Sequence, residues 1–507
     1  MSKPRPGGYP IVLTADRTLM ADYDVLFDGM MGTIQTTSVP EPVMRYLVAP
    51  PMPRRGLRAL KAPLGVRRIE ASLLRSGLDP RDVIVVRPEE LERVVGPRTQ
   101  VVAVSSSDPL GYGMSNTTMT DMAGGRLYTH TWYKRMLRQL ARLRRRGLTF
   151  RIVAGGAGAW QLQQHPRLAR RLGIDHVVLG YAEQDAPALF ERLASGDALP
   201  FVVYANGVRP EQIPAIRAAT SMGVIEVSRG CGKGCQFCTI ARERMVHLPL
   251  ETIVRDVEAN LAAGVTSICA LSEDFFRYGA RGNQVQPDAI KRLARTLRSL
   301  PELKLIQLDH CNVTSAALLS DEDLREIHDI LVEGQRHRFL WVNLGVETAS
   351  GELLEMNQKG GKIKPFQVEE WGELCEATVR RLIRAGFFPM VSLIMGLPGE
   401  RPEHVAATVR WIERLYDERL VIFPIFYSPV DPQHGRPFTL RDMTELHWRL
   451  FRLSYNLNFK WIPHMYWDNQ TGAGAPLWRR LFIQLTGRLQ ILQWTAKFIW
   501  ESGRLTA

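Results

Sequence analysis

Segments typical of buried β-strands alternate with segments typical of amphipathic α-helices along most of this chain. Strands that are joined by helices lie parallel in a sheet, so the alternation restricts the fold to the α/β class. Two such series are present, and residues 206–222, with two prolines and little periodicity, separate them. We therefore predict two α/β domains, over residues 1–205 and 223–435, joined by a linker at 206–222.

The first series predicts a doubly wound, Rossmann-like sheet. Its strands are expected at residues 82–87, 99–105, 149–154 and 176–179. Glycine-containing turns follow the last two strands, Gly155-Gly156-Ala157-Gly158 and Gly180-Tyr181-Ala182-Glu183. Ligands bind at such strand ends, so we expect a binding site at this edge of the sheet. We assign no chemistry to residues 15–24.

The second series predicts an open or partial barrel. Its six strands are expected at residues 223–227, 267–271, 303–308, 339–346, 389–395 and 420–427. Six βα units are fewer than the eight that close a (β/α)8 barrel. The alternation stops near residue 436, and we predict a helical, aromatic-rich region over residues 436–507.

Charge and apolar content narrow the possible partners and location. No apolar run approaches the roughly 20 residues of a membrane span, and the N-terminus shows no signal-peptide pattern, which predicts a cytoplasmic protein. The net charge is +13, from 65 Lys and Arg against 52 Asp and Glu. The densest basic stretch, Arg138–Arg146, lies beside an apolar stripe of Met136, Leu137, Leu140 and Leu143. That pattern favours a solvated helix face over a polyanion site, so we predict no nucleic-acid partner.

Three of the six cysteines lie in one short loop, Cys231-Gly-Lys-Gly-Cys235-Gln-Phe-Cys238, after the first strand of the second series. No cysteine precedes residue 231, which argues against a disulfide framework. Three thiolates can hold three irons of a [4Fe–4S] cluster and leave the fourth iron open. A zinc site, the main alternative, would need a fourth ligand, for which His247 is the near candidate.

This loop, with an aromatic residue before its last cysteine, resembles the signature of the radical S-adenosylmethionine (SAM) enzymes. Further segments resemble the family's motifs in the expected order: Ser272-Glu273-Asp274, Gly345-Val346-Glu347-Thr348 and Gly396-Leu397-Pro398-Gly399-Glu400. The resemblance implies a [4Fe–4S] cluster on Cys231, Cys235 and Cys238. It implies SAM contacts from Phe237, Ser272, Glu273, Asp274, Gly345 and Glu347.

The glycine turns of the first series resemble those of the cobalamin-binding domain that precedes many radical SAM cores. The resemblance implies cobalamin contacts from Ser106, Asp108, Leu110, Gly111, Gly155, Gly156, Gly180 and Glu183. No DxHxxG motif occurs in residues 1–205, so a histidine beneath cobalt is not indicated, and the segment Ser105–Gly113 is expected there instead. A nucleotide-binding Rossmann domain and a sheet without a ligand are the alternatives.

Together these resemblances imply a cobalamin-dependent radical SAM methyltransferase that uses an external one-electron reductant. Its acceptor would be an unactivated carbon, or a phosphinate phosphorus, of a small biosynthetic substrate such as an antibiotic precursor. A radical SAM cyclase or carbon-skeleton enzyme acting on a lipid or tetrapyrrole is an alternative. A methylthiotransferase is disfavoured because residues 1–230 lack cysteines for a second cluster. A non-catalytic iron–sulfur or zinc protein would leave the SAM-type segments unexplained.

The C-terminal region contains an apolar stripe with helical spacing: Trp478, Phe482, Leu485, Leu489, Leu492, Ala496 and Ile499. Trp494 and Trp500 add apolar bulk, and the flanking basic residues are Arg479, Arg480, Arg488 and Lys497. We expect this stripe to pack into the protein core. The alternative is an interfacial helix that makes a peripheral membrane contact through residues 477–500.

Overall fold

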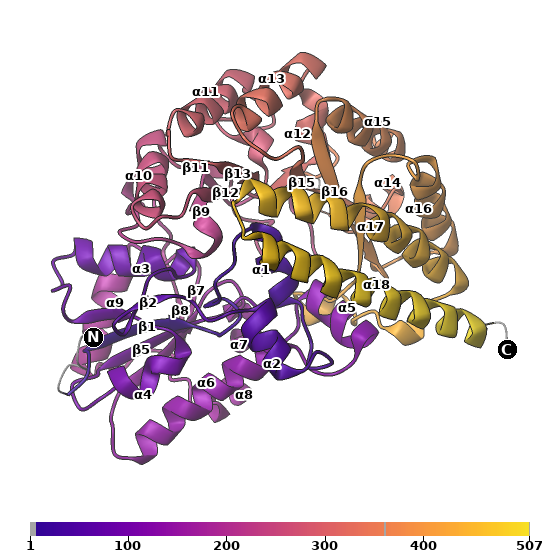
Figure 1. The fold of residues 1–507 in the computed structure, drawn as a ribbon. Coiled ribbons are helices and arrows are strands. Elements are labelled where there is room, and N and C mark those ends of the chain that lie inside the picture. The colour runs from indigo at the N-terminus through magenta and orange to yellow at the C-terminus, as the bar shows by residue number, and fades with distance from the viewer. Residues whose placement is uncertain (1–6, 359–360, 506–507) are drawn as a thin grey trace. The chain divides into compact units, whose positions relative to one another are not determined.

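The chain forms two structural units, each built around parallel strands (Figure 1). The computed structural model describes residues 7–358 and 361–505. The first unit comprises Met1–Ile225 with Leu248–Val265, and the second comprises Glu226–His247 with Thr266–Ala507. The prediction of two α/β domains followed by C-terminal helices agrees with this architecture, although the chain crosses between the units more than once.

A six-stranded parallel sheet forms the centre of the first unit, in the order β4-β1-β5-β6-β7-β8. The strands are β1 (Ile11–Ala15), β4 (Val83–Val85), β5 (Val101–Ser105), β6 (Arg151–Gly155), β7 (His176–Leu179) and β8 (Val202–Tyr204). Sequence reasoning missed β1, although all five of its residues are buried and apolar or small. Because β1 lies between β4 and β5, the strand order reverses there, which creates a topological switch point.

Helices cover both faces of this sheet, as the doubly wound prediction required. One apolar cluster joins Val12 and Val102 to α6 (Tyr128–Arg145) and α7 (Ala159–Gln164). The other joins Leu13 and Val101 to α3 (Leu64–Arg75) and α9 (Ala186–Ser195). The remaining helices of the unit are α1 (Leu26–Thr33), α2 (Glu41–Val43), α4 (Leu91–Val94), α5 (Met114–Ala123), α8 (Pro166–Arg171) and α10 (Leu250–Leu261).

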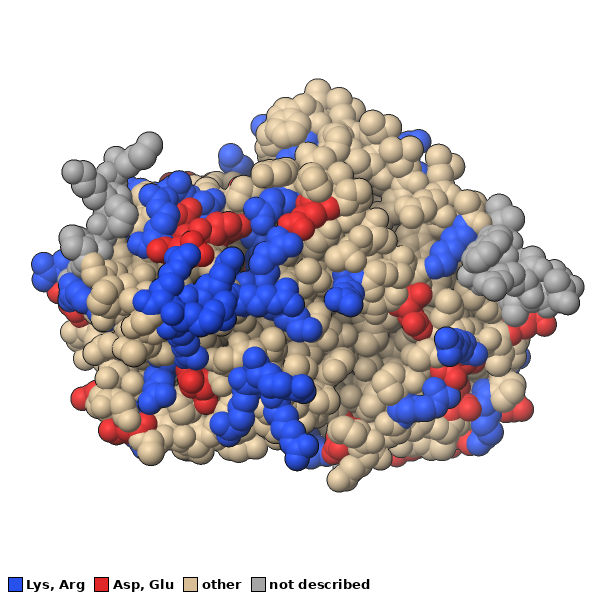
Figure 2. Space-filling model, turned by 90° about the horizontal axis from the view of Figure 1, so that it is seen from below, with Lys and Arg blue, Asp and Glu red and all other residues tan. Residues whose placement is uncertain are grey.

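The basic helix α6 is amphipathic, as its sequence indicated. It buries Met136, Leu137, Leu140 and Leu143, whereas its arginines at 138, 142 and 145 are exposed. Exposed arginines also lie on α8, and Figure 2 shows one face of the molecule on which Lys and Arg side chains gather. The apolar stripe of α6 is therefore core, and its arginines lie on an exposed helix face.

The predicted linker is part of the first unit's packing. Ile213, Ile216 and Ala219 are buried, because polar side chains of α10 hold the backbone of this segment. Asp256 Oδ1 accepts a hydrogen bond from the Ile216 amide at 2.9 Å, and Asn260 Oδ1 accepts one from the Thr220 amide at 2.9 Å. Helix α10, which we placed in the second series, thus belongs to the first unit.

The second unit contains the partial barrel. Strand β13 (Leu305–Leu308) lies parallel to β12 (Ser267–Leu271), and β14 (His310–Asn312), β15 (Leu340–Glu347), β16 (Phe387–Met395) and β17 (Val421–Phe426) form a parallel sheet in that order. Strand β9 (Val224–Glu226) precedes them, and Val227 donates a backbone hydrogen bond to Leu271 at the end of β12. The surrounding helices are α11 (Pro287–Arg298), α12 (Val313–Leu318), α13 (Asp321–Val332), α14 (Gly351–Met356), α15 (Trp371–Arg384) and α16 (Pro402–Arg414).

Two long helices, α17 (Glu445–Gly472) and α18 (Leu477–Leu505), form the predicted C-terminal helical region. The expectation that the apolar stripe is core is wrong: Trp478, Leu485, Leu489 and Leu492 are 58–69% exposed. The opposite face of α18 is the buried one, because Trp494 and Phe498 pack against aromatic side chains of α17. The predicted Ile499 and Trp500 lie outside the described side chains. Within the described part of the chain, no helix is both long and apolar enough to cross a membrane.

Replacement of Asp256 by alanine should strongly destabilise the chain. The buried Arg68 guanidinium of α3 donates to Asp256 Oδ1 at 3.0 Å and would remain buried without this carboxylate. We expect the free energy of unfolding, measured by urea denaturation, to fall by about 3–5 kcal/mol. The exposed Arg255–Glu251 pair on the same helix provides the control, since Arg255→Gln should cost less than about 0.5 kcal/mol. Equal losses in both variants would contradict this account.

Candidate functional site

The three clustered cysteines lie in a loop that its own backbone holds in shape. Two short antiparallel strands, β10 (Ser228–Arg229) and β11 (Val246–His247), close its base. Inside it, the Cys231 amide donates to Glu243 O and the Gly234 amide donates to Ala241 O, both at 2.9 Å. Gly232 and Gly234 have φ values of +71° and +75°, which side-chain-bearing residues rarely adopt. Backbone hydrogen bonds within the chain therefore hold the loop in its shape.

The chemistry of this loop suits an iron–sulfur cluster better than one metal ion. Burial raises the pKa of the Cys235 thiol to about 11 and that of Cys238 to about 12, and it also raises the pKa of Cys231. Buried thiols of this kind become thiolates when a cationic centre binds them. A cubane with three protein ligands takes one thiolate on each of three irons, which three cysteines in one loop can supply, whereas a structural zinc site takes four ligands.

Two buried lysines supply positive charge beside the cysteines, and sequence reasoning missed both. Lys233, inside the motif itself, places Nζ 3.2 Å from Thr314 Oγ1. Lys362 Nζ forms an ion pair with Glu347 Oε1 at 2.5 Å. Burial opposes the charge on Lys362, but Glu347 and then Cys235 outweigh it and raise the lysine's pKa. Buried cations at these positions would stabilise thiolates and an anionic cluster.

In the Ser272-Glu273-Asp274 segment, two residues are buried in hydrogen bonds and the third is half-buried. Asp274 is fully buried at the end of β12, where its carboxylate accepts hydrogen bonds from Asn312 Nδ2 at 3.1 Å and Ser315 Oγ at 2.7 Å. Ser272 Oγ contacts Ser228 Oγ and accepts from the Asp274 amide. Glu273 is the half-buried member. Of the predicted SAM contacts here, Glu273 is thus the one with free surface.

The predicted Gly345–Glu347 segment forms a strained strand end. Glu347 has φ +64°, and the pairing of β15 with β16 is irregular between Gly345 and Glu347. Such backbone occurs where tertiary contacts enforce it, often at binding sites. A Cβ on Gly345 would lie 2.5 Å from Glu347 Oε1 and 2.8 Å from Lys362 Nζ, so a side chain there would displace this ion pair. Phe237, another of the predicted SAM contacts, is buried. In the predicted segment 396–400, the Gly396 amide donates a hydrogen bond to Glu400 Oε1 at 2.9 Å.

One face of the barrel sheet is open. Asn312, Gly345, Ser392 and Phe423 are register partners across β14, β15, β16 and β17, so they share a face. Gly345, Ser392 and Phe423 are half-buried, although most residues of their strands are buried. Since Asn312 reaches Asp274 at the end of β12, this open face is the interior of the partial barrel.

His310, which sequence reasoning also missed, lies on the same face. Its side chain is 47% exposed, and Nδ1 lies 2.8 Å from Asp309 Oδ1. Desolvation opposes protonation of this ring, but Asp309 outweighs it and raises the pKa of His310 to about 9. Burial raises the pKa of Glu273 to about 7, against the lowering effect of His310. The barrel interior therefore holds titratable groups beside the cysteine loop. A histidine at a strand end was the available sequence signal.

In the first unit, the segment Ser105–Gly113 is held by Asp108. This buried carboxylate accepts hydrogen bonds from the amides of Gly111, Tyr112 and Gly113 at 2.8–3.0 Å. Leu110 is part of the apolar core. Asp108 and Leu110 thus shape the loop from within, and Ser106 is buried beneath it.

The glycine turn after β6 packs against this loop. A Cβ on Gly156 would lie 2.3 Å from Ser105 Oγ, and one on Gly158 would lie 2.3 Å from Pro109 Cδ. The space that a side chain at Gly156 would occupy is therefore filled by protein, so this glycine allows the turn to pack against the Ser105–Gly113 loop. Gly155 differs, because a Cβ there would meet no other heavy atom closer than Val178 O at 3.9 Å.

The turn after β7 also contains one residue with space beside it, Gly180, and one that is packed, Glu183. Gly180 has φ +88°, and a Cβ there would be in ordinary contact with Ala205 at 3.6 Å. Glu183 is buried, and its carbonyl oxygen accepts a hydrogen bond from Ser72 Oγ in α3. Gly155 and Gly180 therefore retain room beside them, whereas Glu183 is anchored to the first unit's own core.

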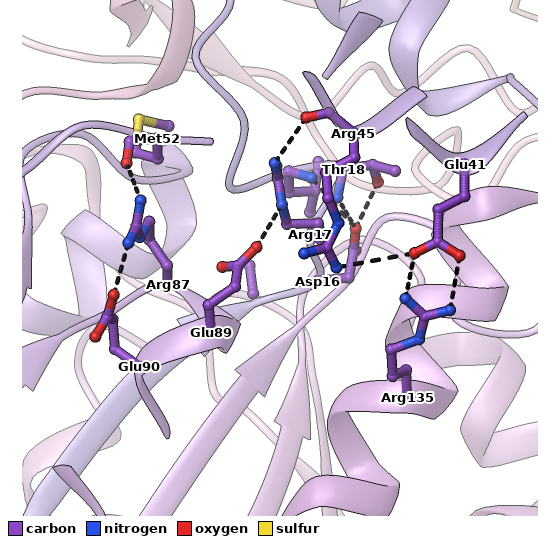
Figure 3. A network of polar contacts seen from close by, with 12 residues as sticks. Asp16, Arg17, Thr18, Glu41, Arg45, Met52, Arg87, Glu89, Glu90 and Arg135 are labelled. Atoms are coloured by element: carbon purple, nitrogen blue, oxygen red, sulfur yellow. Dashed lines mark hydrogen bonds and ion pairs between the residues drawn. The ribbon is translucent and has the colours of Figure 1, made fainter. Parts of the chain in front are cut away.

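A buried polar network occupies the end of β1, where we assigned no chemistry (Figure 3). Asp16 accepts hydrogen bonds from the amides of Thr18 and Leu19, at 2.9 and 3.2 Å. Burial raises the pKa of Asp16, and hydrogen bonds from Thr18 and Ser106 partly oppose this. Arg17 pairs with Glu89 at 2.6 Å. In the sequence, the pair Asp16-Arg17 directly after an apolar segment could have indicated this network. In the fold, the pair lies at the switch point between β1 and β5.

Residues 225–412 match the family model described as the Radical SAM superfamily. The chain contains a radical SAM domain. This domain includes the cysteine loop and the strands β12 to β16. It corresponds to most of the predicted core at 223–435.

Several relatives in sequence are methylthiotransferases. The chain is 26% identical over 251 residues to the tRNA-2-methylthio-N(6)-dimethylallyladenosine synthase of Magnetococcus marinus, covering 49% of this chain and 54% of that protein. It is 23% identical over 313 residues to the ribosomal protein uS12 methylthiotransferase RimO of Trichlorobacter lovleyi, covering 60% and 66%. The chain thus spans between about half and two thirds of the length of these relatives.

A likeness in fold extends over more of the chain. The radical SAM methyltransferase TsrM from Kitasatospora setae, solved with cobalamin and a [4Fe–4S] cluster bound, matches with a TM-score of 0.54. The match covers 83% of this chain and 74% of that chain at 16% identity. The two proteins therefore share a fold across more than the radical SAM domain.

Replacement of Glu273 by glutamine should make the chain less sensitive to pH. In the wild type, the folded-state pKa of about 7 exceeds the ordinary value of 4.5, so stability is fully present below pH 4.5 and lost as pH rises to 7. Above pH 7 the variant should be more stable than wild type by on the order of 1–3 kcal/mol. Urea denaturation of metal-free protein from pH 4.5 to 8 measures this. Glu302→Gln, at an exposed position, controls for removal of one carboxylate; the same profile in both variants would refute the assignment.

Proposed function

We propose that this chain is a cobalamin-dependent radical SAM methyltransferase that acts on a small molecule. The observation that carries the proposal is the presence, in one chain, of a radical SAM domain and a preceding sheet with the order β4-β1-β5-β6-β7-β8. A sheet of this order binds ligands at its switch point. The fold likeness to TsrM, a methyltransferase solved with both cofactors, supports the combination.

In this proposal the second unit holds the cluster and SAM. Cys231, Cys235 and Cys238 ligate the cluster, and Lys233 and Lys362 balance its charge. Glu273 and His310 offer an acceptor and a donor in the open barrel interior, where the amino and carboxylate groups of SAM need partners. Glu347 fixes Lys362 in place through its ion pair. When bound, the cluster would cleave SAM reductively and cobalamin would carry the methyl group to the substrate.

The first unit would hold cobalamin at the carboxyl ends of β1, β5 and β6. The open space beside Gly155 is what a bulky ligand requires, and the loop held by Asp108 provides a preformed wall. The network around Asp16 and Arg17 fixes the end of β1 on the other side of the switch point. These residues position backbone groups and exclude water; the chemistry belongs to the cofactor.

Methylthio transfer is the second candidate, and the relatives in sequence favour it. The basic area in Figure 2 would suit a nucleic-acid substrate. However, residues 1–230 contain no cysteine that could ligate a second cluster. Incubation with methyl-deuterated SAM and analysis for transferred CD3 against transferred S-CD3 separates the two candidates. Product without label would instead favour a cyclase or carbon-skeleton reaction.

The substrate is best sought by comparing metabolites of a deletion strain with those of its parent. Loss of the enzyme should cause accumulation of a compound lighter by one methyl group than a compound of the parent. The small-molecule assignment predicts this change in the metabolite pool. A change confined to RNA or ribosomal protein would favour methylthio transfer.

Alanine at Cys231, Cys235 or Cys238 should abolish SAM cleavage. With one of three thiolates gone, the cluster becomes labile, so the iron content after anaerobic reconstitution should fall with the activity. Iron and sulfide analysis together with 5′-deoxyadenosine formation measures both effects. Cys269→Ala, a buried thiol in β12, is the matched control and should retain cluster and cleavage. Full iron content and activity in any loop variant would contradict the assignment.

Valine at Gly155 should lower cobalamin affinity at least about tenfold while the chain stays folded. The side chain fits the protein alone, because its Cβ has open space, but it would occupy the proposed cofactor groove. Absorption titration with hydroxocobalamin measures the affinity, and iron content should be unchanged.

Two further valine variants act as controls. Gly65→Val, in α3 where a Cβ would meet nothing within 4 Å, should bind cobalamin normally. Gly156→Val should destabilise the fold through Ser105. Absence of any cobalamin binding by the wild type would refute the proposed cofactor, whereas normal binding by Gly155→Val would refute its position only.

A further inference from the structure

Helix α18 presents a continuous apolar face that no other described segment of the second unit covers. Its members recur every three or four residues and are each more than half exposed: Leu477, Trp478, Leu481, Leu485, Leu489 and Leu492. Residues at this spacing lie on one side of a helix. Exposed apolar surface of this extent is unfavourable in water and marks an interaction site.

The opposite face of α18 is firmly attached to α17. Trp494 stacks on Tyr455 with ring centroids 5.4 Å apart, and Phe498 lies edge-on to Phe451 at 5.7 Å. Gln484 Nε2 donates to the Pro463 carbonyl at 2.7 Å. The helix therefore cannot turn its leucines inward without giving up an aromatic core, and the exposed face is a fixed feature of the second unit.

Charge identifies the partner of this face. Residues 477–498 contain four basic residues and no Asp or Glu. Arg480 is engaged by Trp467 and Thr471, but Arg488 is exposed and lies between Leu485 and Leu492 on the apolar face. A second copy of this face would bury Arg488 against leucines or against another arginine, which is costly. An anionic lipid surface accepts both kinds of residue, since leucines enter the acyl boundary while arginine reaches phosphate groups.

We propose that α18 is an interfacial helix that docks the second unit on an anionic membrane surface. The leucine face lies in the headgroup region, and the aromatic contacts with α17 remain on the protein side. Docking is peripheral, as no helix of the described part could cross a membrane. The proposal concerns location and is independent of the reaction that the chain catalyses.

Flotation of the full chain with vesicles tests this proposal. We expect binding to vesicles of phosphatidylcholine with phosphatidylserine, and much weaker binding to phosphatidylcholine alone. The triple variant L481Q/L485Q/L492Q should bind on the order of a hundredfold more weakly. Arg488→Gln should weaken binding to anionic vesicles about fivefold, because one basic contact is lost.

The double variant L318Q/Y416Q provides the matched control. It replaces exposed apolar residues elsewhere in the second unit and should bind as wild type does. Thermal unfolding followed by CD should show that all variants are folded, which is expected because each changed side chain is exposed. Failure of the wild type to float, or unchanged flotation of the triple variant, would overturn the proposal. A dimer in sedimentation analysis that the triple variant abolishes would instead assign the face to a second copy.

Discussion

Parallel strands end at the same edge of a sheet, and every candidate site in this chain depends on that constraint. In the first unit it brings the loops after β1, β5 and β6 together, so that Asp16, Asp108 and Gly155 come from distant parts of the sequence. In the second unit it brings the ends of β12, β14 and β15 to the cysteine loop. Residues that are far apart along the chain therefore act in one place.

Burial of charge is the second constraint, and the chain satisfies it by placing polar or oppositely charged side chains against each of these buried groups. Asp274 is held by Asn312 and Ser315, and Lys362 is held by Glu347. These contacts fix the geometry around the cysteines without a cofactor. Lys233 and Lys362 lie where thiolates and a cluster would carry negative charge, so the polypeptide supplies a matched electrostatic environment. Glu273 and His310 keep free surface in the same place, which suits ligand binding.

Much of the fold could be predicted from the sequence because strand and helix periodicity is local. The strands β5, β6, β7, β12, β15 and β16 were predicted within a few residues. Strand β1 was missed because five residues near a terminus give a weak periodic signal. The segment 206–222 looked like a linker since proline and low periodicity suggest one. Asp256 and Asn260, some 40 residues later, hold it in the core, and no local pattern reveals such partners.

The sequence by itself determined the two α/β series and the cysteine loop, because both depend on residue types at short spacing. It also determined that α18 is amphipathic. Only the tertiary structure decided which face of that helix is buried, since Trp494 and Phe498 find aromatic partners on α17 and the leucines do not. It likewise decided that Gly156 serves packing and Gly155 leaves space. In both cases the outcome depends on contacts between residues distant in sequence, and such contacts exist only once the chain has folded.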